Sequence, residues 1–96
     1  MLKNFRTYHL AKELYRRCEG IKARSYMKDQ LLRASLSIVL NVAEGSAKGT
    51  VKERRRFYRI SLASLRETQA ILDLLDRRGE LQLADQLGGC LYRLSR

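Results

Sequence analysis

The stretch from Asp29 to Gly45 places the strongest constraint on how this 96-residue chain folds. Its sequence, DQLLRASLSIVLNVAEG, has the length and composition of a helix that is apolar on nearly every side. A single file of polar residues, spaced three or four apart and therefore on one face, runs through it: Gln30, Arg33, Ser37, Asn41 and Glu44. A helix with so much apolar surface is buried on most sides, so it is predicted to be the central helix of the fold.

The rest of the chain also has the periodicity of helices, and proline is absent. Four helices joined by short links are predicted: Asn4–Ile21, Ser25–Glu44, Thr50–Arg78 and Glu80–Leu94. Gly45 and Gly79 are expected to end the second and third helices, and Thr50 forms a capping box with Glu53. Residues 1–96 are therefore predicted to form a single all-α domain, an antiparallel up-down-up-down four-helix bundle.

The second helix has more apolar surface than one bundle core uses. One stripe of it contains Met27, Leu31, Ala34, Ile38 and Val42, and further apolar residues occupy other sides. Because a helix in a four-helix bundle buries one broad stripe, the surplus predicts a subunit interface and hence a homo-oligomer.

The charge of the chain is strongly positive. Twenty Lys and Arg residues face ten Asp and Glu residues, giving a formal net charge of +10, and arginine predominates among the basic residues. Arginine presents a planar fork that binds phosphate through two hydrogen bonds. The composition therefore favours a nucleic acid or another polyanion as partner, the alternative being a basic surface that only maintains solubility.

The basic residues cluster where the third predicted helix begins. The candidate nucleic-acid-binding residues there are Lys48, Lys52, Arg54, Arg55, Arg56 and Arg59, with Arg66 near the same face. Cations at a helix N-terminus oppose the helix dipole, and a bound anion would relieve that cost. A second patch is expected to extend the cluster: Lys12, Arg16, Arg17, Lys22 and Arg24. The alternative is a solvated face partly paired with Glu44 and Glu53.

The polar file of the second helix has a structural and a functional interpretation. In an antiparallel hairpin, Arg33 would face Glu67, and Glu44 would lie near Lys52, Arg55 and Arg56. The first interpretation is an internal network that fixes helix register, formed by Gln30, Arg33, Ser37, Asn41, Glu44 and Glu67. The second is that Arg33, Asn41 and Glu44 line a ring pore or a ligand site.

No constellation of residues indicates catalysis. His9, the sole histidine, lies near the edge of the apolar stripe of the first predicted helix, and Cys18 and Cys90 are isolated thiols without metal-ligand spacing. No glycine-rich phosphate loop, helix-turn-helix signature, zinc pattern or aromatic base-stacking motif is visible. We therefore expect no catalytic residue, no metal and no cofactor. Because no run of residues is apolar enough for a signal peptide or a membrane span, we expect a cytoplasmic protein with no membrane partner.

The segment QLLRASLSIVLNVAEG, followed by Phe57, Ser64, Leu65 and Glu67, carries a family resemblance. It resembles the four-helix-bundle proteins encoded in intervening sequences of bacterial large-subunit ribosomal RNA genes. The resemblance implies a left-handed antiparallel bundle that assembles into a ring, typically a homopentamer. A related branch is the accessory variability determinant of diversity-generating retroelements, a pentameric bundle that binds nucleic acid and partners a reverse transcriptase.

Charge and resemblance together lead to one functional prediction and its alternatives. The chain is predicted to be a non-enzymatic, oligomeric basic protein that binds nucleic acid, with RNA favoured by the resemblance, through phosphate contacts. The alternative is a protein–protein scaffold or accessory subunit that recruits a partner such as a reverse transcriptase. A third interpretation is a protein retained with a mobile element and without a strong host function.

Overall fold

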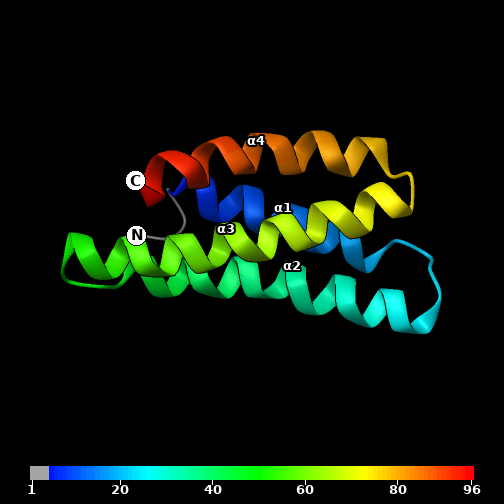
Figure 1. Ribbon diagram of the computed structural model, residues 1–96, viewed down its shortest axis with the longest axis horizontal. Helices are drawn as coiled ribbons and strands as arrows, with labels where there is room; N and C mark the ends of the chain where they lie inside the picture. The colour runs from blue at the N-terminus through cyan, green and yellow to red at the C-terminus, as the bar shows by residue number, and fades with distance from the viewer. Residues whose placement is uncertain (1–4) are drawn as a thin grey trace.

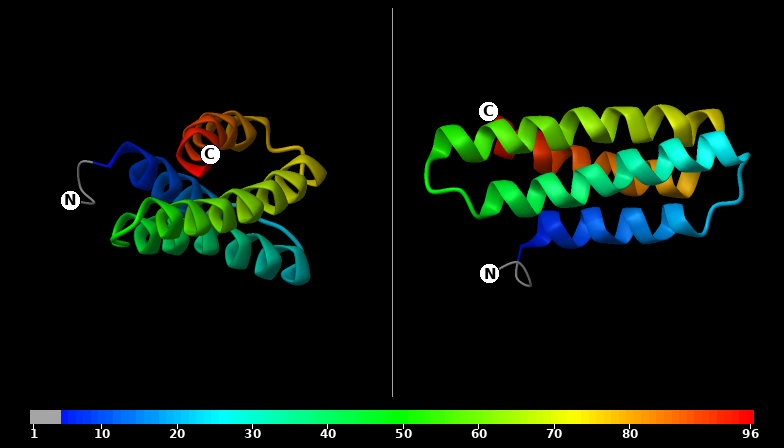
Figure 2. Two further views of the ribbon diagram at one scale, coloured as in Figure 1. Left: turned by 60° about the vertical axis from the view of Figure 1, so that its left-hand side comes forward. Right: turned by 90° about the horizontal axis from the view of Figure 1, so that it is seen from below.

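The computed structural model describes residues 5–96, which form four helices in a bundle about 40 Å long and 21 Å wide. The helices are α1 (Arg6–Glu19), α2 (Ser25–Ser46), α3 (Val51–Leu74) and α4 (Arg78–Ser95). They run in alternating directions, and each packs against two others, so that α1 closes the bundle against α4 (Figures 1 and 2). The predicted all-α antiparallel four-helix bundle is confirmed.

The core is formed by one apolar stripe from each helix. Leu14 of α1, Ile38 of α2 and Leu65 of α3 are completely buried, as are Leu87 and Leu91 of α4. Small residues bring α2 and α3 close together along their length. The Ser61 hydroxyl donates to the carbonyl oxygen of Ile38 at 2.9 Å, and Ser61 is itself fully buried.

The link between α2 and α3 is built by a capping box on one side and a close glycine contact on the other. Glu53 donates its backbone N–H to the Thr50 hydroxyl oxygen at 3.1 Å, which confirms the predicted cap. Gly45, however, does not end α2 with a left-handed residue, because the helix continues to Ser46. A Cβ atom at Gly45 would lie 2.9 Å from Cε1 of Tyr58, so the glycine permits α3 to approach α2 closely.

Three other predicted boundaries need correction or lie outside the described residues. α3 ends at Leu74 rather than Arg78, and Gly79 is the second residue of α4 rather than a terminator. The chain reverses instead at Asp76, which adopts the left-handed conformation with φ of 57°. Aspartate tolerates this region better than most residues. The predicted start of the first helix at Asn4 lies outside the described residues.

Within residues 5–96, no helix combines the length and the apolar character that crossing a membrane requires.

Candidate nucleic-acid interface

Charge is distributed unevenly along the bundle. We call the end that contains the α2–α3 link and the C-terminus of α4 the basic end, and the opposite end the far end. Among residues 5–96, the basic end has two acidic residues, Glu44 and Glu53, and nine basic ones: Arg6, Lys48, Lys52, Arg54, Arg55, Arg56, Arg59, Arg93 and Arg96. The α2–α3 hairpin projects beyond α1 and α4 at this end (Figures 1 and 2). The protruding tip therefore carries Lys48, Lys52, Arg54, Arg55 and Arg56, whereas Arg59 lies level with the C-terminus of α4, where it reaches the carbonyl oxygen of Ser95.

The far end has a similar number of charges but nearly balances them. Its five acidic residues are Glu19, Asp29, Asp73, Asp76 and Glu80, and its seven basic residues are Arg16, Arg17, Lys22, Arg24, Lys28, Arg77 and Arg78. Ion pairs form here over 2.8 Å between Arg17 and Glu13, and over 2.9 Å between Arg77 and Glu80. The Lys28 ammonium group donates to the carbonyl oxygens of Glu19, the last residue of α1, and of Ile21, which follows the helix.

At the basic end, the cations are mostly without acidic partners. The ion pair there joins Lys48 to Glu44 at 3.4 Å, and within the described residues Lys52, Arg55 and Arg56 form none. Two arginines are instead held by backbone oxygens. Arg54 donates to the carbonyl of Lys48 at 3.1 Å, and Arg59 donates to the carbonyl of Ser95 at 3.0 Å.

These contacts give the cluster a defined shape. The Phe57 ring lies between two cations, with Lys48 Nζ 5.0 Å and Arg56 Cζ 5.4 Å from its centroid. A groove of about 690 Å³ runs along the outside of the first turns of α3, lined by Thr50, Lys52, Glu53, Arg56, Arg59 and Ile60. The lining combines three cationic side chains, those of Lys52, Arg56 and Arg59, with one carboxylate, that of Glu53.

The second predicted patch does not extend this cluster. The rings of Phe5 and Tyr58 lie 6.4 Å apart, which places the start of α1 level with the second turn of α3. Arg16 and Arg17 therefore lie roughly 15 Å further along the bundle, at the far end. The prediction that they add to the basic cluster is wrong, because α1 runs away from the α2–α3 link. Arg66 lies about 10 Å beyond Arg59 on α3 and donates to Gln69 at 2.9 Å.

The polar file of α2 forms a network only in its middle. The hydroxyl groups of Ser37 and Ser64 lie 2.8 Å apart, and the Asn41 amide donates to the Ser37 carbonyl at 2.8 Å and to its hydroxyl at 3.1 Å. These contacts tie α2 to α3 and support the interpretation of a network that fixes register.

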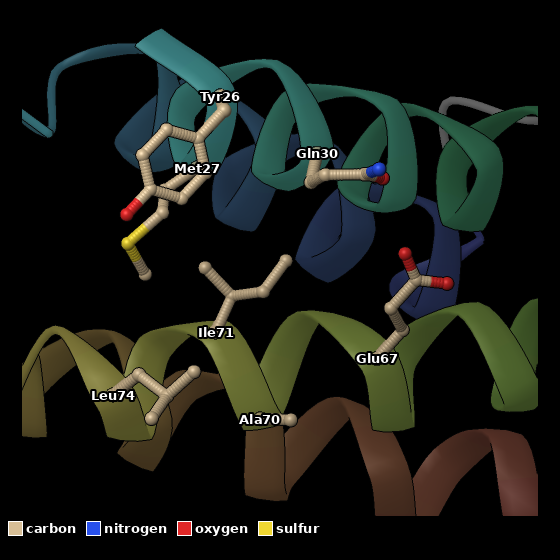
Figure 3. Close-up of a pocket in the computed structure, with 7 residues that line it drawn as sticks. All are labelled: Tyr26, Met27, Gln30, Glu67, Ala70, Ile71 and Leu74. Carbon is tan, nitrogen blue, oxygen red and sulfur yellow. The ribbon is translucent and has the colours of Figure 1, made fainter. Parts of the chain in front are cut away.

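The ends of the polar file were predicted incorrectly. Gln30, Arg33, Glu44 and Glu67 are all exposed, and no ion pair joins Arg33 to Glu67 within the described residues. Glu44 pairs with Lys48 on its own side of the link rather than with Lys52, Arg55 or Arg56. The physical reason is the rotation of the helices about their axes: Gln30 and Glu67 face a groove that is open to solvent (Figure 3), and the antiparallel alignment gives only the height of a residue along the bundle.

A comparison with protein families matched residues 5–88 to the family described as 23S rRNA-intervening sequence protein. The chain belongs to this family. The match covers α1, α2, α3 and the first half of α4, and it confirms the resemblance seen in the sequence. No curated protein and no solved structure matched the chain.

In this family member, the surplus apolar surface predicted for α2 is exposed. Leu36 and Leu40 lie on the outside of α2, with 39% and 57% of their surface accessible. Near the far end, a groove of about 560 Å³ that is open to solvent lies between α2 and α3 (Figure 3). Its lining is mostly apolar: Tyr26, Met27, Gln30, Glu67, Ala70, Ile71 and Leu74.

The thiols and the histidine do not form a reactive site. Burial raises the pKa of the Cys18 thiol to about 11, so Cys18 is a protonated core residue at neutral pH. His9 is exposed on α1, and its ring meets that of Tyr8 edge-on at 5.8 Å. Across residues 5–96, no group of potential ligands is positioned to hold a metal ion.

One residue beside the cluster was missed from the sequence. Tyr92 of α4 is 56% exposed, and Cζ of Arg96 lies 5.5 Å from its ring centroid. The helix pattern around Tyr92 gives no sign of a site, because Arg59 and Arg66 belong to α3 and reach α4, at Ser95 and Gly88, only when the two helices pack.

Proposed function

We propose that this protein is a non-enzymatic nucleic-acid-binding protein whose basic end contacts the phosphate backbone. The observation that carries the proposal is the contrast in pairing: nine cations share the basic end with two carboxylates, while the far end is nearly balanced. RNA is the favoured partner, because the family is described by its link to ribosomal RNA.

The mode of binding follows from the side chains available. Lys52, Arg55 and Arg56 project from the first turns of α3 without a carboxylate to hold them within the described residues. Arginine forks and lysine ammonium groups bind phosphate oxygens without reading base identity. Binding of this kind is expected to fall steeply with salt and to depend weakly on sequence.

We also propose that the protein acts as a homo-oligomer, a pentameric ring as the resemblance implies. The support is the exposed apolar surface of α2, with Leu36 and Leu40 facing outward from the bundle. In a cyclic assembly whose helices run along the symmetry axis, every subunit presents the same end to the same face. The basic ends would then form a cationic annulus, which multiplies phosphate contacts.

The test compares two charge reversals of equal size in the full chain. One variant combines Lys52→Glu, Arg55→Glu and Arg56→Glu at the basic end, and the control combines Arg16→Glu, Lys22→Glu and Arg24→Glu at the far end. None of these six side chains forms an ion pair within residues 5–96. Binding to a labelled ribosomal RNA fragment and to duplex DNA is measured across a salt series.

The expected result is a loss specific to the basic end. When log affinity is plotted against log salt concentration, each lost phosphate contact makes the slope shallower by about one. The slope of the basic-end variant should therefore be shallower by about three than that of the unaltered protein. The control should retain most of the slope. Equal losses in the two variants would show that only net charge matters, and no binding by the unaltered protein at low salt would overturn the proposal.

A second candidate function is a protein–protein scaffold or accessory subunit, with a reverse transcriptase as the kind of partner that the related branch implies. The observation that favours it is the apolar groove between α2 and α3, whose Tyr26 and Leu74 are 65% and 74% exposed. Under this alternative, the basic end would bind an acidic surface of the partner protein. The charge-reversal variant would then no longer bind that protein, and neither the unaltered protein nor the variants would bind RNA.

A further inference from the structure

We propose that the basic end binds single-stranded nucleic acid, with the ring of Tyr92 stacking against a base. This inference rests on the proposed function and specifies the form of nucleic acid that the same site takes. The evidence is the position of Tyr92 relative to three arginines of α3 and α4.

Three residues of α4 share the side that faces α3. Gly88, Tyr92 and Ser95 are spaced four and three residues apart, so they follow one another along one face of the helix. Each end of this row contacts a different arginine of α3. Arg59 Nε donates to the carbonyl of Ser95 at 3.0 Å, and Arg66 Nη1 lies 3.6 Å from where a Cβ atom of residue 88 would be.

Tyr92 therefore lies between the places where Arg59 and Arg66 reach α4. These two arginines are seven residues apart on α3, which is about 10 Å along the helix. Arg96 adds a third guanidinium group, with Cζ 5.5 Å from the Tyr92 ring centroid. Because more than half of the Tyr92 surface is exposed, the ring remains accessible among the cations.

Two further guanidinium groups lie over the glycines of α4 beside this ring. Arg66 Nη1 lies 3.6 Å from where a Cβ atom of residue 88 would be, and Arg93 Nη1 lies 3.7 Å from the corresponding position at residue 89. Gly88 is buried and Gly89 half-buried, so arginine side chains form the surface at these two positions. A nucleotide strand that crosses α4 beside Tyr92 therefore meets guanidinium groups that can bind its phosphates.

This combination suits a single strand better than a duplex. Base–aromatic stacking contributes to single-strand binding whatever the base, and guanidinium groups beside the ring hold the phosphates. In a duplex the bases are stacked on one another, so only the phosphates can be reached, and Tyr92 contributes little. The ring is thus the feature that distinguishes the two forms of nucleic acid.

The test uses two substitutions of Tyr92 and one matched control. Tyr92→Leu keeps an apolar side chain but removes the ring, and Tyr92→Phe keeps the ring. Tyr26→Leu makes the same change at another highly exposed tyrosine, at the far end. Binding is measured by fluorescence anisotropy with an oligouridine and an oligothymidine of about 12 nucleotides and with a duplex RNA of the same length.

We expect Tyr92→Leu to weaken binding of both single strands by about tenfold, since stacking on one base has an effect of this size, and to leave duplex binding unchanged. Tyr92→Phe and Tyr26→Leu should bind like the unaltered protein. Equal single-strand affinity in Tyr92→Leu, or an equal loss for duplex, would overturn the stacking role while leaving phosphate binding intact. Failure of the unaltered protein to bind any of the three at low salt would overturn the proposed function and this inference together.

Discussion

The far end of the bundle carries seven basic and five acidic residues, whereas the basic end carries nine and two. At the far end, Arg17, Arg77 and Arg78 each lie within 3.1 Å of a carboxylate oxygen. At the basic end, backbone carbonyl oxygens rather than carboxylates accept hydrogen bonds from Arg54 and Arg59, and they do not neutralise the positive charges. The two ends carry similar numbers of charged residues, twelve and eleven, so the balance between acidic and basic residues is what separates them.

The comparison indicates what each set of charges contributes. Paired charges at the far end hold the α3–α4 turn and the last turns of α1, although exposed pairs of this kind add little stability. Unpaired charges at the basic end repel one another and oppose the dipole of α3, at a cost of some tenths of a kcal/mol each. An anionic partner removes that cost, which is why the basic end is the end we assign to binding.

The largest effect on stability is expected when Gly45, in the α2–α3 hairpin of the basic end, gains a methyl group. Gly45→Ala would place Cβ 2.9 Å from Cε1 of Tyr58, a buried ring, and 3.1 Å from Cβ of Phe57. Overpacking here should lower the free energy of unfolding by about 1–2 kcal/mol, even after the gain in helix propensity. Denaturant unfolding of the full chain measures the change.

Gly79→Ala is the matched control at the far end. No atom lies within 4 Å of a Cβ added there, and Gly79 is in the first turn of α4. This change should leave the free energy of unfolding unchanged or raise it by up to about 1 kcal/mol. If both alanines proved equally tolerated, the close packing that positions the basic hairpin would be contradicted.

A smaller effect is expected from the ion pair at the far end. The hydrogen bond from Arg77, at 2.9 Å, lowers the pKa of the Glu80 carboxyl, while its partial burial acts in the opposite direction. Because the folded pKa lies below the unfolded one, the pair stabilises the fold above the ordinary pKa of glutamate and loses this contribution as pH falls through the folded value. Glu80→Gln should therefore cost about 0.5 kcal/mol near neutral pH and nothing near pH 2 to 3.

Urea unfolding at the two pH values measures this difference. Glu44→Gln serves as the comparison at the basic end, where the ion pair with Lys48 is longer, at 3.4 Å, and the carboxylate is about half exposed. Its cost should be smaller than that of Glu80→Gln at neutral pH. A Glu80→Gln difference that is the same at both pH values would contradict an electrostatic role.

The sequence predicted the features that depend on neighbours within one helix. Lys52, Arg55 and Arg56 follow one another at the start of α3, so their clustering needed no knowledge of packing. The position of Arg16 and Arg17 was predicted wrongly, although the alternating helix directions already place the end of α1 away from the α2–α3 link. Residues 5–88 also matched the family that the α2 and α3 pattern had indicated.

What the sequence did not reveal depends on contacts between helices. Gly45 fits the pattern of a helix terminator, but in the structure a glycine is needed there because Tyr58 of α3 approaches so closely. Only the packing of the two helices determines that approach. The exposure of Arg33 and Glu67 depends on how α2 and α3 are rotated about their axes, which antiparallel alignment leaves undetermined. Arg96 follows Tyr92 by four residues, but Arg59 and Arg66 reach α4 near Tyr92 only through the packing of α3 on α4, which no spacing within α4 indicates.

The most direct test of the account is to map where RNA contacts the protein. A single-stranded RNA carrying a photoreactive uridine is crosslinked to the full chain at low salt, and the modified peptides are identified by mass spectrometry. We predict crosslinks in residues 48–66 and 88–96 and few in residues 16–28. Crosslinks concentrated at the far end, or spread evenly over both ends, would contradict the assignment of binding to the basic end.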